Sequence, residues 1–103
     1  MPYIAGVLEE ERERLVHQKS EYMAILEQLP RIGGSIVEKT ISRHIYYYFA
    51  YRDGKKVRTD YIKKAHIEEF RKKIAERDRI RGIISGIDSD LEIIEKTLVG
   101  KKK

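Results

Sequence analysis

The strongest constraint on the fold of this chain is a change of hydrophobic period that happens twice. Apolar residues recur at helical spacings over residues 4–29 and again over residues 65–99. Between these segments, residues 35–63 alternate with a period of two and are rich in β-branched and aromatic side chains, which is typical of strands. This order predicts an α+β fold with a long helix, a three-stranded antiparallel meander and a second long helix.

Local signals indicate where the meander begins and where it turns. Pro30 should stop the first helix, because the residue before a proline is pushed out of the α region. Asp53-Gly54 predicts a two-residue hairpin turn, since the turn types that fit such hairpins need a positive φ angle at their centre. The expected strands are residues 35–41, 45–51 and 56–63, with a short turn at Ser42-Arg43-His44 between the first two.

The register expected from this turn divides the strand residues between two faces. With Asp53 and Gly54 at the centre of the turn, Ala50 pairs with Val57. One face then holds Tyr46, Tyr48, Ala50, Val57, Thr59 and Tyr61, and it is expected to be the face that the helices cover. The opposite face mixes aromatic rings with charge and holds Ile45, Tyr47, Phe49, Tyr51, Lys56, Arg58, Asp60 and Ile62.

The second helical segment carries two apolar stripes that are out of step. One stripe covers residues 67–74, and a seam with alternating steps of three and four residues begins after Arg77, which indicates a shift of register or a bend there. Gly86 and a capping-box pattern that starts at Ser89 leave open a break into two helices. Residues 100–103 are expected to form a basic tail.

The three segments are expected to form a single domain over residues 1–103. Two long helices joined by a compact meander should fold back as an antiparallel pair with the sheet at one end. Because each helix alone has a narrow, gapped apolar stripe, self-association through the second helix is predicted. The predicted oligomer interface is the seam of Ile80, Ile84, Ile87, Leu91, Ile94 and Leu98.

Composition restricts the classes of function open to the chain. The sequence has no cysteine, which excludes disulfides and thiolate chemistry and favours a reducing, cytoplasmic location. Its longest apolar runs are much shorter than a membrane span, so no membrane partner is expected. A formal net charge of +5, to which three terminal lysines contribute, points only weakly to polyanion partners.

The sequence offers little support for catalysis. His17, His44 and His66 lack the spacing of a metal-binding helix, and neither a phosphate-binding glycine loop nor a nucleophile elbow is present. The carboxylates in residues 88–92 lack the further ligands and the glycine of a calcium loop. We therefore expect no enzyme activity, no metal site, no cofactor and no small-molecule substrate.

The Tyr-rich hairpin is the best candidate for a functional site. Aromatic rings stack on bases and neighbouring cations meet phosphates in single-strand binding, and a two-stranded ribbon also fits the major groove of duplex DNA. The predicted nucleic-acid-binding residues are Arg43, Tyr47, Phe49, Tyr51, Lys55, Lys56 and Arg58. A basic helix face adds Lys63, Lys64, Arg71, Lys72, Lys73, Arg77, Arg79 and Arg81. In the simpler interpretation the tyrosines pack within a thin sheet and the helix face is only solvated.

The central stretch also resembles a class of small uncharacterised bacterial and archaeal domains of unknown function. The resemblance is carried by Leu29-Pro30 with Gly34-Ser35-Ile36, by the run from Tyr46 to Val57, and by Tyr61-Ile62-Lys63-Lys64. These match a pattern of "LP-G-S-I", a "YYYLQYRDGGKV" hairpin and a "YI-KK" strand end between two coiled-coil helices. Ile32-Gly33 lengthens the first motif, and Phe49-Ala50 stands where Leu-Gln is usual. The resemblance implies architecture and no activity.

Two functions from different classes are consistent with the sequence. The first is a small nucleic-acid-binding accessory protein that uses the hairpin and the basic helix face. The alternative is a coiled-coil interaction module, either a self-assembling adaptor or an inhibitor of a host nucleic-acid enzyme, with no nucleic-acid binding of its own. Salt-dependent binding to DNA or RNA separates the two.

Overall fold

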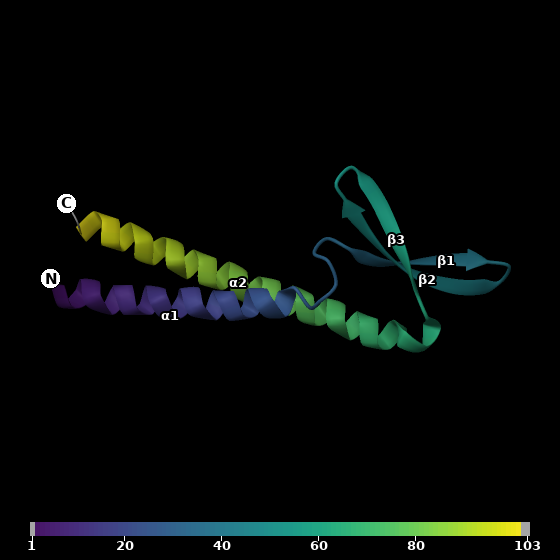
Figure 1. The fold of residues 1–103 in the computed structure, drawn as a ribbon, viewed down its shortest axis with the longest axis horizontal. Coiled ribbons are helices and arrows are strands. Elements are labelled where there is room, and N and C mark those ends of the chain that lie inside the picture. The colour runs from purple at the N-terminus through teal and green to yellow at the C-terminus, as the bar shows by residue number, and fades with distance from the viewer. Residues whose placement is uncertain (1, 102–103) are drawn as a thin grey trace. The chain divides into compact units, whose positions relative to one another are not determined.

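The computed structural model describes the backbone of residues 2–101 and the side chains of residues 5–100 (Figure 1). It confirms the α+β class, with a helix, a three-stranded antiparallel sheet and a long helix in that order. The elements are α1 (Pro2–Leu26), β1 (Ser35–Ile41), β2 (His44–Asp53), β3 (Lys56–Ile62), the 3-10 helix η1 (Lys64–His66) and α2 (Ile67–Lys101). No helix in this part of the chain has an apolar stretch long enough to cross a bilayer.

The ends of several elements differ from those expected. α1 ends at Leu26 rather than at residue 29, because the residues that lead into Pro30 form a turn. His44, expected in a turn, is instead the first residue of β2. α2 runs without a break through Gly86 and includes Lys101, so the predicted basic tail is partly helical, and Lys102 and Lys103 lie outside the described residues.

The chain forms two compact units, and α2 contributes to both. The helix-pair unit contains α1 and the part of α2 from Arg79 onward, and the sheet unit contains residues 27–78. The single domain over residues 1–103 stays a prediction.

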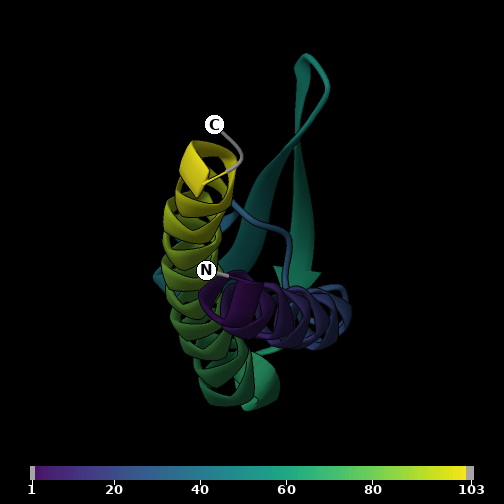
Figure 2. The same cartoon turned by 90° about the vertical axis from the view of Figure 1, so that its left-hand side faces the viewer.

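The helix-pair unit is an antiparallel pair whose two described ends, Pro2 and Lys101, lie together (Figure 2). Two ion pairs define the direction: Arg12 to Glu95 at 3.1 Å, and Lys19 to Asp88 at 2.6 Å. Residues later in α1 thus lie beside residues earlier in α2, as in an antiparallel pair. A thin apolar core lies between the helices and consists of Leu15, Ile87, Ile94 and Leu98, with Ala5, Leu8, Tyr22, Ile83 and Leu91 packed against it.

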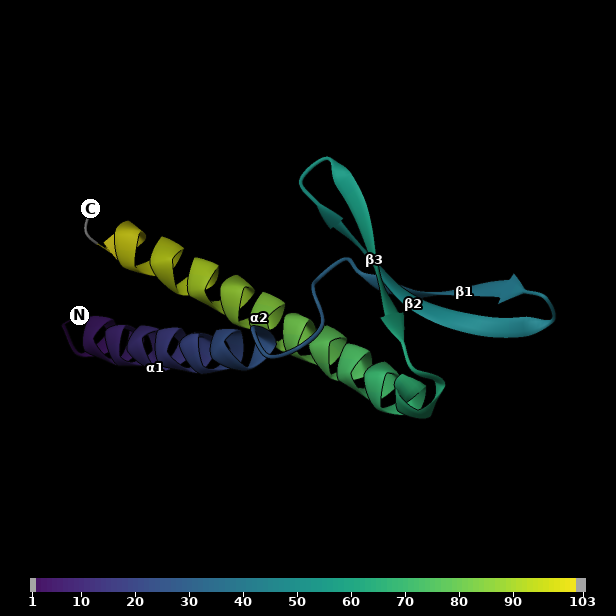
Figure 3. The same cartoon turned by 45° about the vertical axis from the view of Figure 1, so that its right-hand side comes forward.

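The sheet unit is a meander in which β2 lies between β1 and β3. β1 pairs with β2 from His44 to Ala50, whereas β3 pairs with it from Tyr47 to Asp53. The sheet is therefore three strands wide only at residues 47–50, and the two hairpins leave this region in different directions (Figure 3). Across it, Val37, Tyr48 and Tyr61 form one row of neighbours.

The second hairpin turns one residue later than expected. Asp53 pairs with Lys56, so Gly54 and Lys55 are the central residues, and Gly54 has the positive φ angle of 64°. The pairing is shifted by two residues from the expected register, and Ala50 lies opposite Thr59 rather than Val57. Because a shift of two keeps each side chain on its own face, the expected division into two faces is nevertheless correct.

The helix covers the opposite face from the one expected. Phe49 and Ile62 are buried against Ile67, and Phe70 and Ile74 of α2 pack on the same cluster. These strand residues belong to the face that mixes aromatic rings with charge, which we call the packed face. The other face, which carries Tyr46, Tyr48 and Tyr61, has no element of the sheet unit packed on it in the described structure, and we call it the open face.

The first hairpin closes with two non-glycine residues in the left-handed region. Ser42 and Arg43 have φ angles of 49° and 68°, the pattern of a type I′ turn, which Asn-Gly normally fills. An L-residue in this conformation is strained by about 1–2 kcal/mol. The turn therefore retains strain that a glycine would relieve.

Arg43→Gly is accordingly expected to raise the free energy of unfolding by about 1 kcal/mol, measured by chemical denaturation. Lys55→Gly is the matched control, because Lys55 also occupies a two-residue turn but is not among the residues with positive φ. The control should bring no gain. A loss of stability in Arg43→Gly would contradict the strain interpretation.

Candidate nucleic-acid interface

The three aromatic residues predicted to stack on bases lie on the packed face. Phe49 is only 6% exposed, and its ring centroid is 5.1 Å from that of Phe70 and 5.8 Å from that of Tyr51. Tyr47 and Tyr51 are half-buried against the same cluster. These rings hold the sheet to α2, so the Phe49 ring in particular has no free face for a base.

A guanidinium lies over each of the two half-buried tyrosines. The Arg31 Cζ atom is 5.4 Å from the Tyr51 ring centroid, and the Arg71 Cζ atom is 5.6 Å from that of Tyr47. Such contacts stabilise partly exposed rings by about 0.5–1 kcal/mol. A base would have to displace these guanidinium groups before it could stack on either tyrosine.

The four basic residues of the predicted site are exposed but are divided between the two hairpins. Arg43 lies in the first turn, whereas Lys55 and Lys56 lie at the second. Arg58 donates from its Nε atom to the Asp53 carboxylate at 2.9 Å, so its charge is partly neutralised. Since the hairpin tips point in different directions (Figure 3), these cations extend a basic surface and do not converge on one point.

The open face combines cations with the exposed ring of Tyr61 and the half-buried rings of Tyr46 and Tyr48. The Tyr48 and Tyr61 ring centroids are 5.7 Å apart at an interplanar angle of 62°, and the Lys39 ammonium lies 4.8 Å from the centroid of Tyr48. Tyr61 remains 57% exposed, although it lies beside another ring. Arg52 is also exposed on this face, next to Val57.

Acidic residues are absent from the open face. The strands contain three carboxylates, Glu38, Asp53 and Asp60, and the register puts all three on the packed face. The side chains of the open face in the three strands are Ser35, Val37, Lys39, Ile41, His44, Tyr46, Tyr48, Ala50, Arg52, Val57, Thr59 and Tyr61. Its charged groups are therefore all cationic.

The sequence prediction missed Arg52 and the tyrosines of the open face, because it expected that face to be covered. The signal that could have found them is the position of the acids. Glu38, Asp53 and Asp60 alternate onto the other face in any register with the correct parity. A face that carries rings and cations but no carboxylate is the unusual one.

The chain matches a domain of unknown function, DUF6788, over residues 7–72. This match covers more than half of the sequence and includes the whole sheet. The chain belongs to the DUF6788 family. No curated protein and no solved structure matches it. The DUF6788 match is consistent with the resemblance to uncharacterised domains and carries no activity with it.

The net charge of this DUF6788 protein is concentrated in the sheet unit. Residues 27–78 contain thirteen Lys and Arg side chains against eight Asp and Glu, which gives a formal charge of +5. The remainder of the chain contains nine of each and is neutral. The whole excess of the protein, +5, is thus the excess of the sheet unit.

The basic helix face of the DUF6788 chain is less available than its sequence indicates. Arg77 is buried, with its Nη1 atom donating to the backbone carbonyls of Arg31 and Gly34 at 2.8 and 2.9 Å. Arg71 pairs with two carboxylates, Glu68 at 2.7 Å and Glu38 at 3.7 Å. Arg77 is therefore a structural residue. Its guanidinium is buried and occupied, which corrects the prediction that Arg77 belongs to the basic helix face.

The predicted oligomer interface of the DUF6788 chain is already covered within one molecule. Ile80, Ile84, Ile87, Ile94 and Leu98 are buried, and Leu91 is half-buried. Three of the buried residues form the core of the helix pair with Leu15 of α1. Self-association stays a prediction.

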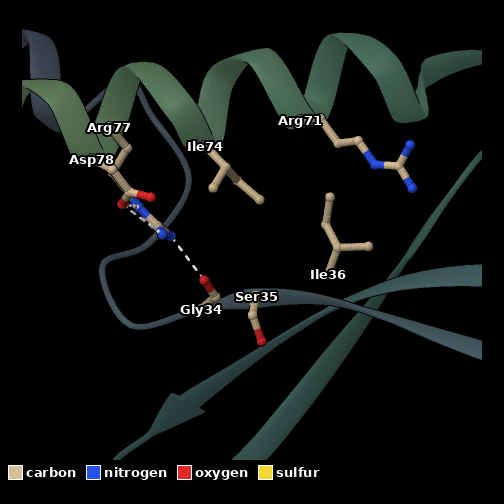
Figure 4. Close-up of a pocket in the computed structure, with 7 residues that line it drawn as sticks. All are labelled: Gly34, Ser35, Ile36, Arg71, Ile74, Arg77 and Asp78. Atoms are coloured by element: carbon tan, nitrogen blue, oxygen red, sulfur yellow. Dashed lines mark hydrogen bonds and ion pairs between the residues drawn. The ribbon is translucent and has the colours of Figure 1, made fainter.

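A cavity of about 320 Å³ lies in the sheet unit between the start of β1 and α2 (Figure 4). It is lined by Gly34, Ser35, Ile36, Arg71, Ile74, Arg77 and Asp78. Ile36 and Ile74 make it largely apolar, and the Nε and Nη2 atoms of Arg77 both contact one Asp78 carboxylate oxygen at 2.9 Å. Within residues 5–100, no group of three His, Cys, Asp or Glu side chains could hold a metal ion.

Proposed function

We propose that this DUF6788 protein binds nucleic acid through the open face of its sheet, without a catalytic step of its own. The observation that carries the proposal is the segregation of charge. The sheet unit holds the entire net charge of +5, and the open face contains cations and no carboxylate. A polyanion is attracted to the cations of this face, and no carboxylate of the face repels it.

The physical basis is the release of counterions from the phosphate backbone. Each phosphate that a Lys or Arg neutralises releases a condensed cation, which favours binding and makes the affinity fall with salt. Lys39 and Arg52 lie on the open face itself. Arg43, Lys55 and Lys56 at the two turns extend the basic surface along an extended ligand.

Charge-neutralising variants test this proposal. Arg52→Gln is expected to weaken binding to an oligonucleotide and to lower the slope of log K against log salt by about one unit, and Lys39→Gln with Arg52→Gln by about two. Fluorescence anisotropy at several salt concentrations measures both quantities. Arg81→Gln is the matched control, because it removes the same charge from an exposed position in the neutral helix-pair unit.

The control variant should bind as the wild type does. An equal loss in Arg81→Gln would show that net charge or the basic helix face, rather than the open face, determines the affinity. Absence of binding to either DNA or RNA at low salt would end the proposal. The interaction module would then be the better interpretation of the chain.

A further inference from the structure

We infer that the open face is a stacking platform for unpaired bases, so that the ligand is single-stranded rather than duplex nucleic acid. This inference rests on the proposed function and adds the class of ligand to it. It depends on three features of the open face: the arrangement of its tyrosines, the exposure of Tyr61, and the lack of Asn and Gln side chains.

The tyrosines form a contiguous array on the open face. Tyr48 and Tyr61 are neighbours across β2 and β3, and Tyr46 lies two residues from Tyr48 along β2 on the same face, about 7 Å away. Tyr48 and Tyr61 lie where the sheet is three strands wide, whereas Tyr46 lies just outside this region and is paired with β1 alone. Rings fixed in this way offer successive bases a platform. Folding has already ordered these side chains, so binding loses little further conformational entropy.

The open-face tyrosines take no part in the core of the sheet unit, and Tyr61 is the exposed one among them. The buried cluster of the sheet unit consists of Phe49, Ile62 and Ile67, and the open-face tyrosines do not belong to it or pack against it. Tyr61 is more than half exposed, and the face of the Tyr48 ring is occupied by the Lys39 ammonium group. A base that stacks on Tyr48 would have to displace that ammonium, as it would have to displace the guanidinium groups over Tyr47 and Tyr51, and the displaced cation is then positioned to meet the adjoining phosphate.

The chemistry of the face suits stacking. Lys39 and Arg52 could each contact a guanine edge in a duplex, but Asn and Gln, which make bidentate contacts with adenine in the major groove, do not occur between residues 35 and 63. Within a duplex the faces of the bases are covered by their neighbours, so tyrosine rings gain contact only with unstacked bases. Stacking is also tolerant of sequence, because every base has a π-face.

The test compares one oligonucleotide sequence as a single strand and as a duplex, by fluorescence anisotropy at low salt. The single strand is expected to bind more tightly. Tyr61→Leu and Tyr48→Leu should each weaken its binding by roughly 5- to 150-fold, the effect of losing one stacked base. Tyr47→Leu on the packed face is the matched control, and it should leave the affinity of the folded protein unchanged.

Tyr61→Leu is the most informative variant. Because the Tyr61 side chain is exposed, its replacement is not expected to unfold the protein. Quenching of tyrosine fluorescence by the single strand, and not by the duplex, is expected as an independent sign of stacking in the unmodified protein. Equal affinity for the two forms, or tyrosine variants that bind as the wild type does, would overturn the inference. If Arg52→Gln still weakened binding in that case, the proposed function would stand without the stacking inference. If neither the single strand nor the duplex bound, the proposed function and the inference would both be wrong.

Discussion

Gly34→Ala is expected to lower the free energy of unfolding by about 3 kcal/mol, the upper part of the range for an overpacked core. Gly34 is buried, and a β-carbon built at this position would overlap three carbon atoms of the Phe49 ring. Phe49 has little room to move, because it is buried and its ring centroid is 5.1 Å from that of Phe70. The backbone before β1 would have to move away from the sheet.

The matched control is Gly33→Ala at the adjoining position. Gly33 has a φ angle of 84° and no atoms near its missing side chain, so it would suffer only conformational strain of about 1–2 kcal/mol. Gly34→Ala combined with Phe49→Leu should recover part of the loss caused by Gly34→Ala in a double-mutant cycle, because the smaller side chain makes room. A cycle without coupling, or a fully stable Gly34→Ala protein, would contradict the packing described here.

Tyrosine fluorescence during denaturant titration is a suitable measurement. The protein has seven tyrosines and no tryptophan, and five of those tyrosines lie in β2 and β3. The signal therefore reports mainly on the sheet unit. Far-UV circular dichroism, which reports helix content, follows α1 and α2 in the same samples.

The alternation of the strand residues was sufficient to predict the two faces, but not to decide which of them is covered. Tyr46, Tyr48 and Tyr61 are no less apolar than a row that includes Lys56 and Asp60. The deciding factor is the connection to α2. Ile62 is buried at the end of β3, and the chain continues through η1 to the buried Ile67, so the helix must lie on the face of Ile62.

The change of register across Arg77 has a cause that lies outside the helix itself. Residues 67–74 of α2 pack against the sheet, whereas residues 87–98 pack against α1. Because the two apolar stripes of α2 contact different elements, they need not lie on the same side of the helix. Gly86 costs about 1 kcal/mol of helix propensity, and burial of the neighbouring Ile84 and Ile87 outweighs that cost, which explains the unbroken helix.

The structural role of Arg77 could not be predicted from the sequence, because it depends on backbone atoms more than forty residues away. Arg31 to Gly34 form a turn in which the Gly34 N–H donates to the Arg31 carbonyl at 3.0 Å, with the positive φ angle of Gly33 typical of a type II turn. Arg77 Nη1 donates to the carbonyls of both end residues of that turn. In the sequence, Arg77 is one basic residue among many on a charged helix.

Arg77→Met is expected to lower the free energy of unfolding by about 2–4 kcal/mol, since each buried carbonyl left without its donor costs about 1–3 kcal/mol. Arg71→Met is the matched control on the same helix, because Arg71 is exposed, and its ion pairs and its contact with the Tyr47 ring each stabilise the fold by at most about 1 kcal/mol. Hydrogen exchange at the Gly34 amide should become faster in Arg77→Met and stay slow in Arg71→Met.

Binding separates this structural role from a role at a phosphate. In the temperature range where Arg77→Met is folded, its affinity for an oligonucleotide and its salt slope should equal those of the wild type, because the guanidinium is buried and occupied. Arg52→Gln should do the opposite, with unchanged stability and weaker binding, because Arg52 is exposed on the open face. A lower salt slope in folded Arg77→Met would return Arg77 to the nucleic-acid surface, and stability equal to that of Arg71→Met would remove its role at the turn.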